Sequence, residues 1–230
     1  MNYPIVKAEG DRAWMKYCGF LDLSLQQFMS IQETLLLQQI DMMSRCRLGQ
    51  RLLGSQPPTT LREFRSTVPL TKYADYFPEL DQCEDGALPE KPYAWASTFG
   101  ANGTNKRVPY SHRAFQKTLD SMMTMLILAC SSRRGQSTIA DGDRILFNVA
   151  PKPYLSGLLA DAAHEQFNFR LVLPPDTHDA REFKEKLKES FETSLRTGMD
   201  VLVAMTSVLV KTGSEFGEHS RKKSAVKHFL

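Results

Sequence analysis

The chain has 230 residues, of which 42% are hydrophobic and 24% charged, and its formal net charge at pH 7 is +3. This composition is typical of a globular protein and excludes a disordered chain, a collagen-like fibre and a disulfide-rich scaffold. A net charge this small for the length gives no indication of a nucleic-acid partner.

The sequence contains no sign of a membrane span, a secretion signal or a metal-binding motif. The longest apolar stretches, residues 122–130 and 199–210, are far shorter than the roughly 20 residues that cross a bilayer. The segment His164-Glu-Gln-Phe-Asn168 lacks the second histidine of an HExxH zinc helix. The four cysteines are widely spaced and form no CxxC pair: Cys18, Cys46, Cys83 and Cys130. We therefore predict a cytoplasmic protein with reduced thiols, no membrane partner and no metal ligands.

The first 92 residues have the pattern of a helical region. Ser24 followed by Gln27 is a capping-box pattern, and apolar residues then recur at three- and four-residue steps towards Gly49. We expect the first long helix to stop at this glycine. A second capping pattern begins at Thr60 and predicts another, short helix. Residues 1–92 are therefore expected to form a helical N-terminal region.

Residues 93–220 have the alternation of an α/β subdomain. Apolar strands alternate with helices: we expect strands at 93–97, 106–110, 144–150, 169–173 and 201–204, and helices at 111–130, 155–167, 179–196 and 207–216. Strands that are apolar on both sides indicate a mainly parallel sheet with helices on both faces. The predicted fold class is therefore α/β, a helical N-terminal segment followed by this sheet. Residues 221–230 are expected to be a basic, frayed tail.

The segment from Trp95 to Tyr110 has the composition of an anion-binding loop. Gly100 and Gly103 allow close approach of the backbone to a ligand, and successive N–H groups in such a loop can hold an anion. Lys106 adds a fixed positive charge. This set of groups suits a polyphosphate. On composition alone, an ordinary glycine-containing hairpin loop with an exposed lysine is the simpler interpretation.

The wider sequence favours the ligand-binding interpretation. Thr98-Phe-Gly-Ala-Asn-Gly-Thr-Asn-Lys106 resembles the phosphate-binding loop of the adenylate-forming superfamily, and its continuation is most similar to phenylacetate-CoA-ligase-like proteins and auxin-responsive acyl-acid amido synthetases. Residues 64–76 resemble the segment that precedes the loop in these two branches. Residues 141–147 and 151–157 resemble the strand that follows it and the approach to the acyl pocket. The resemblance extends from about residue 64 to residue 216.

The resemblance implies an ATP-dependent ligase that activates a carboxylic acid as acyl-AMP and transfers the acyl group to CoA or an amine. It implies ATP and Mg²⁺ as cofactors. The residues implied to bind the nucleotide are Thr98, Gly100, Ala101, Asn102, Gly103, Thr104 and Lys106. Those implied to line the acid pocket are Tyr154, Ser156 and Gly157, although ordinary packing explains Tyr154 equally well. No catalytic residue is assigned.

The loop also departs from the family pattern. Phe99, Ala101 and Asn102 occupy positions that usually carry hydroxyl groups, and the loss of donors weakens an anion site. The family's later aromatic-Gly-x-Thr/Ser-Glu motif has no convincing counterpart. We therefore expect the chain to be the first part of a longer adenylating enzyme. In isolation it should show no turnover, and its partner would be the missing C-terminal part of the enzyme. The alternative is a non-catalytic adenylation-like module that binds a nucleotide or a protein.

Overall fold

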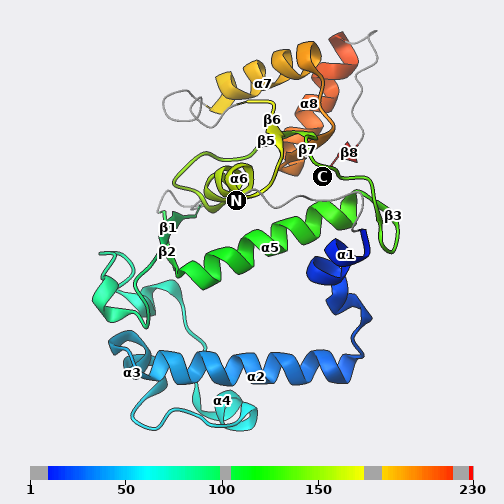
Figure 1. The fold of residues 1–230 in the computed structure, drawn as a ribbon. Helices are drawn as coiled ribbons and strands as arrows, with labels where there is room; N and C mark the ends of the chain where they lie inside the picture. Colours follow the sequence, from blue (N-terminus) through cyan, green and yellow to red (C-terminus); the bar gives the residue numbers. More distant parts are fainter. Residues whose placement is uncertain (1–9, 99–104, 174–182, 220–227, 230) are drawn as a thin grey trace. The chain divides into compact units, whose positions relative to one another are not determined.

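The computed structural model describes residues 10–98, 105–173, 183–219 and 228–229 (Figure 1). By its contacts the chain divides into two compact units. The helical unit is Gly19–Lys117, and the sheet unit combines Met1–Cys18 with Thr118–Leu230. The sequence-based boundary at residue 93 falls inside the helical unit and stays a prediction.

The helical unit contains short and long helices and one pair of strands. In chain order they are η1 (Gly19–Asp22), α2 (Leu25–Ser44), α3 (Arg47–Leu53), α4 (Leu61–Thr67), η2 (Tyr73–Tyr76), η3 (Asp85–Ala87), β1 (Ala94–Ser97), β2 (Arg107–Tyr110) and the first residues of α5 (His112–Ala129). The predicted capping box is present, since Ser24 N donates to Gln27 Oε1 at 2.9 Å and Gln27 N donates to Ser24 Oγ at 3.3 Å. The described residues before β1 form only helices and connecting segments, in agreement with the predicted fold class.

The first long helix ends earlier than expected. It stops at Ser44, and Gly49 lies buried inside α3. A Cβ atom at Gly49 would lie 1.8 Å from the carbonyl oxygen of Met43. The glycine is therefore required by the close approach of α3 to the end of α2, and the expectation that it terminates the helix is wrong.

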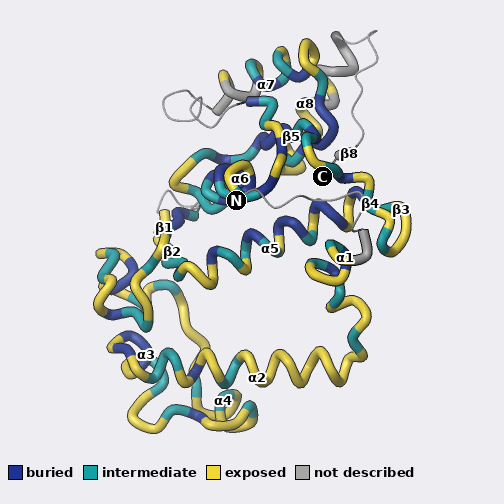
Figure 2. The backbone as a smooth tube through the Cα atoms, in the orientation of Figure 1, coloured by how far each residue is buried: buried dark blue, intermediate teal, exposed yellow. Residues whose placement is uncertain are grey.

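Half of the apolar residues of α2 are exposed (Figure 2), namely Leu25, Phe28, Met29, Ile31 and Leu35. Of its 20 residues only Ile40 is buried. The core of the helical unit lies instead beyond the end of α2, around Cys46, Leu48 and Leu80. Tyr73 and Tyr76, among other side chains, pack against this core.

The sheet unit contains the remaining elements. They are α1 (Gly10–Cys18), the rest of α5, β3 (Ser131–Arg133), β4 (Gln136–Ser137), β5 (Arg144–Asn148), α6 (Leu155–Gln166), β6 (Arg170–Leu171), α7 (Phe183–Thr197), β7 (Val201–Ala204), α8 (Thr206–His219) and β8 (His228–Phe229). The C-terminal part of α5 is held to α1, because Thr124 Oγ1 donates to the carbonyl of Tyr17 at 2.8 Å.

A four-stranded sheet forms the centre of this unit, in the order β6-β5-β7-β8. All three strand pairs are parallel, and the central pair runs in register from Ile145 opposite Val201 to Asn148 opposite Ala204. Four of the five residues of β5 are buried, so both of its faces are covered. The predicted α/β class with a mainly parallel sheet is confirmed.

Two features of the sheet unit differ from expectation. The antiparallel pair β3–β4 follows α5 and was not predicted. Within the segment expected to be a frayed tail, His228 and Phe229 form β8 and pair with Val201 and Leu202. The rest of the tail lies outside the described residues. None of the helices in the described ranges has the length and hydropathy that a bilayer crossing requires.

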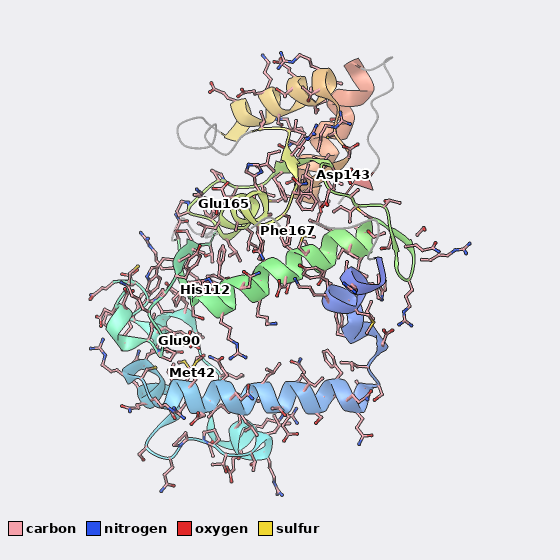
Figure 3. The ribbon with its side chains drawn as sticks, viewed as in Figure 1. Met42, Glu90, His112, Asp143, Glu165 and Phe167 are labelled. Atoms are coloured by element: carbon pink, nitrogen blue, oxygen red, sulfur yellow. The ribbon has the colours of Figure 1, made fainter. Side chains whose placement is uncertain are left out.

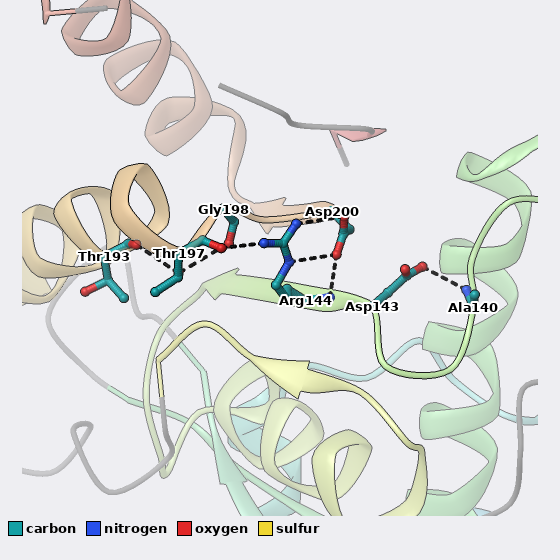
Figure 4. A network of polar contacts seen from close by, with 7 residues as sticks. All are labelled: Ala140, Asp143, Arg144, Thr193, Thr197, Gly198 and Asp200. Atoms are coloured by element: carbon teal, nitrogen blue, oxygen red, sulfur yellow. Dashed lines mark hydrogen bonds and ion pairs between the residues drawn. The ribbon is translucent and has the colours of Figure 1, made fainter. Parts of the chain in front are cut away.

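A charged pair ties β5 to β7 at the start of both strands (Figure 4). Asp200 Oδ2 accepts from the backbone N–H of Arg144 at 2.9 Å and from its Nε at 3.0 Å, and Oδ1 accepts from the guanidinium at 3.1 Å. The guanidinium also donates to the carbonyl of Thr197. Gly198 has a φ of +77°, and a Cβ there would lie 2.5 Å from Arg144. The turn before β7 therefore requires glycine.

All four cysteines are free thiols in the structure. Three of them are buried, and Cys83 is half-buried. Burial, reinforced by the charge of Asp143, raises the pKa of Cys130 to about 11. This thiol therefore stays protonated and unreactive near neutral pH.

Candidate functional site

The antiparallel strands β1 and β2 hold the two ends of the predicted phosphate loop. Ser97 lies opposite Arg107, and one step further the backbone N–H of Thr98 donates to the carbonyl of Lys106 at 2.9 Å. Thr98 and Lys106 are thus brought together at the base of the loop. The other predicted nucleotide-binding residues lie outside the described residues: Gly100, Ala101, Asn102, Gly103 and Thr104.

Tyr73 anchors the start of β2, directly after Lys106. Its hydroxyl accepts from the backbone N–H of Arg107 at 2.7 Å and donates to the carbonyl of the same residue at 2.9 Å. The ring meets Phe77 edge to face, with centroids 5.4 Å apart. The single hydroxyl of Tyr73 binds both the backbone N–H and the carbonyl of Arg107. The backbone beside Lys106 is therefore fixed in position and direction.

The ammonium group of Lys106 lies 5.5 Å from the centroid of the Tyr73 ring, within the range of a cation–π contact. Lys106 is exposed and forms no ion pair with another described residue. Its charge is therefore not neutralised by a described carboxylate. Sequence reasoning placed Tyr73 in the segment before the loop but gave it no role in the site.

The predicted acid-pocket residues share one turn of the sheet unit, at the start of α6. Tyr154 is the N-cap residue, and the Ser156 hydroxyl donates to the carbonyl of Ala150 at 3.1 Å. Gly157 is buried, and a Cβ there would lie 2.5 Å from the backbone of Pro151 and of Lys152. Glycine and serine therefore shape the tight passage from β5 into α6. These three residues and the loop residues belong to different units of the chain.

Two buried polar groups near this turn were missed by sequence reasoning. Asn148, the last residue of β5, is 1% exposed, and its Oδ1 has no hydrogen-bond partner among the described residues. Asp161 on α6 pairs with Lys152 through Oδ2, while its buried Oδ1 has no partner in the described part of the chain. Ligands of parallel sheets bind beyond the carboxyl ends of the strands, where Asn148 stands. An amide that ends an otherwise apolar strand was the available signal.

No metal centre is formed by the described residues. They contain no group of three or more histidine, cysteine, aspartate or glutamate side chains that could hold an ion. The ring Nδ1 of His164 on α6 lies 3.3 Å from the carbonyl oxygen of Phe169, so this ring nitrogen has a hydrogen-bond partner within the protein.

A family model described as "GH3 family N-terminal domain" matches residues 18–164. The chain belongs to the GH3 family. The matched range contains Tyr73, the loop from Thr98 to Lys106, and the turn at Ser156. The resemblance to the acyl-acid amido synthetase branch of the adenylate-forming enzymes is thereby confirmed.

A solved structure has a similar fold. The structure titled "AtGH3.15 acyl acid amido synthetase in complex with 2,4-DB" is similar to this GH3 chain, with a TM-score of 0.68 and 13% sequence identity. The match covers 95% of this chain and 40% of that chain. This GH3 chain therefore spans 40% of the length of that synthetase. No curated protein matches its sequence.

Proposed function

We propose that this chain is the first part of an ATP-dependent adenylate-forming ligase. The enzyme activates a carboxylic acid as acyl-AMP, releases pyrophosphate, and passes the acyl group to an acceptor. The observation that carries the proposal is the position of Lys106, exposed at the base of a glycine-containing loop and fixed there by Tyr73. An amine acceptor is favoured over CoA, because the similar solved structure is titled an acyl acid amido synthetase.

In the proposed reaction a carboxylate oxygen of the acid attacks the α-phosphorus of ATP, and the bond to pyrophosphate breaks. The loop from Thr98 through residues 100–104 to Lys106 holds the β- and γ-phosphates. Lys106 offsets the negative charge that grows on the leaving pyrophosphate, so its contribution is electrostatic stabilisation and positioning. Tyr73 is a positioning residue, because it acts through the backbone beside Lys106.

The acid is proposed to bind beside the turn that contains Tyr154, Ser156 and Gly157. The Ser156 hydroxyl already donates to Ala150, so it offers only its oxygen as an acceptor. Mg²⁺ remains part of the proposal through the family resemblance, but the described residues supply no ligand cluster and we assign it no step. Free thiols, three of them buried, support the proposed cytoplasmic location.

A non-catalytic module remains the second candidate. It is favoured by Phe99, Ala101 and Asn102, which replace hydroxyl donors of the family's loop. Such a module would bind a nucleotide or a protein without releasing pyrophosphate. The two candidates therefore differ in whether pyrophosphate exchange takes place at all.

The role of Lys106 is tested by Lys106→Ala in the natural protein that contains this chain. We expect acid-dependent exchange of pyrophosphate into ATP to fall by about 100-fold or more, because one fixed charge is removed from a preorganised anion site. Lys91→Ala is the matched control, since Lys91 is also exposed and lies in the same unit. Tyr73→Phe should lower exchange by a smaller factor, since it frees the backbone beside Lys106 but leaves the charge. Equal rates for the Lys106 and Lys91 variants would refute the assignment of the loop.

A further inference from the structure

Arg51 on α3 binds three acceptors in the segment of residues 75–79. Its Nη1 donates to the carbonyl of Asp75 at 2.7 Å. Its Nη2 donates to the carbonyl of Phe77 at 3.3 Å and to Oε2 of Glu79 at 2.7 Å. Figure 3 labels Met42 near the end of α2, and α3 follows α2 in the chain. Because the guanidinium is planar and presents its donors in a fixed arrangement, it holds these acceptors at one position relative to α3.

Glu79 keeps the guanidinium on this segment. The carboxylate is 4% exposed, whereas the side chain of Arg51 is 42% exposed. A buried carboxylate that loses its partner is strongly unfavourable, so the ion pair draws Arg51 towards the segment and away from solvent. The charge of Arg51 is therefore used inside the protein and is not offered to a ligand.

The segment that Arg51 binds begins with a short turn that has few other contacts. The turn is η2, and its residues are exposed apart from the half-buried Tyr73 and Tyr76. Hydrogen bonds within so short a 3₁₀ helix have poor geometry and stabilise it weakly. The backbone N–H of Lys72 donates to Oδ2 of Asp75 at 2.6 Å, and Arg51 binds the carbonyl of the same aspartate. The position of the turn therefore depends on Arg51 as well as on the packing of the two tyrosines.

Tyr73 connects this turn to the end of the predicted phosphate loop. Its hydroxyl binds the backbone N–H and the carbonyl of Arg107, and its ring lies 5.5 Å from the ammonium group of Lys106. A continuous path of contacts thus leads from Arg51 through the carbonyl of Asp75 and the turn to Tyr73, and from Tyr73 to β2. The whole path lies within the helical unit, Gly19–Lys117.

We propose that Arg51 is a positioning residue of the phosphate loop, which acts through Tyr73 on the place of Lys106. The inference rests on the proposed function of Lys106 and adds to it a residue from a separate helix. When the turn is released, Lys106 keeps its charge but loses its fixed place. A charge that must meet a leaving pyrophosphate is less effective when it is not held in position, so the rate falls through positioning.

The link between α3 and the loop is tested in the 230-residue chain without ATP, by amide hydrogen exchange measured with NMR. We expect Arg51→Met to speed hydrogen exchange at the backbone N–H of Arg107 by at least about tenfold, because the acceptor on Tyr73 is no longer held in place. Arg47→Met is the matched control. Arg47 lies one turn earlier on α3 and pairs with Glu84, so its loss should change hydrogen exchange at Arg107 by about twofold or less.

A second variant guards against a general loss of stability. Arg51→Met alone leaves the buried carboxylate of Glu79 without its partner, whereas Arg51→Met combined with Glu79→Gln removes both charges. We expect the same acceleration at Arg107 in the double variant. Unchanged amide hydrogen exchange in the sheet unit shows that either variant is folded.

The effect on the reaction is tested in the natural protein that contains this chain. Arg51→Met should lower acid-dependent pyrophosphate exchange about tenfold, with the KM for the acid unchanged. In the Tyr73→Phe background the same substitution should lower the rate by about twofold or less, because the two residues act along one path. A merely structural arginine would lower the rate by the same factor in both backgrounds.

Each result decides for or against the proposal. Unchanged hydrogen exchange at Arg107 in both Arg51 variants would overturn the link to the loop. Faster hydrogen exchange without a change in pyrophosphate exchange, or equal factors with and without the Tyr73 hydroxyl, would overturn the positioning role. A wild-type protein that exchanges no pyrophosphate with any acid would refute the proposed function instead, while hydrogen exchange at Arg107 would still decide the link.

Discussion

Gly157 stands where the chain turns from β5 into α6 with no room for a side chain. A Cβ atom there would lie 2.5 Å from the backbone of Pro151 and of Lys152. We expect Gly157→Ala to lower the free energy of unfolding by about 1–3 kcal/mol, the usual cost of overpacking. Gly86→Ala is the control, because no atom lies within 4 Å of its added Cβ. Urea unfolding of both variants checks this; equal stabilities would mean that the turn relaxes freely.

The individual residues of the site were only partly predictable. Thr98 and Lys106 could be chosen from a local pattern of glycines, short polar residues and a lysine. Tyr73 could not, because its partner Arg107 is 34 residues away and the hydrogen bonds form only in the folded chain. Asn148 ends a predicted strand, which was a signal, but its burial depends on the whole sheet and could not be predicted from the residues around it.

The pairing of β5 with β7 depends on the contact between Arg144 and Asp200. We expect Asp200→Ala to lower the free energy of unfolding by about 2 kcal/mol. This value allows for screening by solvent, because the side chain of Arg144 is 35% exposed. Asp41→Ala, which removes an exposed pair with Arg45 on α2, should change stability much less. Thermal unfolding of the two variants tests this order. The reverse order would show that the contact does not hold the strands together.

Elements were predicted well where local rules decide them. The caps at Ser24 and Thr60 start α2 and α4 as expected, because a capping hydrogen bond involves residues only three apart. The role of Gly49 was predicted wrongly, because the contact between α2 and α3, and not the end of a helix, requires glycine at this position. The strand β8 was missed because only pairing with β7 defines it.

The stability of the molecule in acid should depend on Glu79. This carboxylate is 4% exposed and accepts from Arg51 at 2.7 Å. Burial alone would raise the pKa of Glu79, but the hydrogen bonds to its backbone N–H and to Arg51, with the charges of Arg51 and Arg47, lower it overall. A lowered pKa in the folded state stabilises the protein above the unfolded value of about 4.3 and loses this effect as the pH falls through the folded value.

We therefore expect the free energy of unfolding to decrease as the pH falls below about 4.3, and Glu79→Gln to remove part of this decrease. The control is Glu165→Gln, which changes an exposed carboxylate on α6. Urea unfolding at a series of pH values measures the slope. Identical slopes for the wild type and the Glu79 variant would contradict the assignment.

At the scale of the whole molecule, composition and apolar periodicity predicted the α/β class and the parallel sheet. The predicted boundary at residue 93 stays a prediction, since the boundary between contact units depends on which distant segments pack together. Acid and acceptor identity stayed open because pocket specificity arises from side chains distributed over the fold. The chain spans 40% of the similar synthetase, so its proposed activity concerns the longer protein.

The proposed function requires the natural protein that contains this chain to form acyl-AMP. The most direct measurement is exchange of labelled pyrophosphate into ATP, with and without a panel of aryl and alkyl carboxylic acids. We expect label in ATP only when a suitable acid is present, with AMP released once an amine acceptor is added. Absence of exchange with every acid, or exchange that needs no acid, would contradict the proposed formation of acyl-AMP.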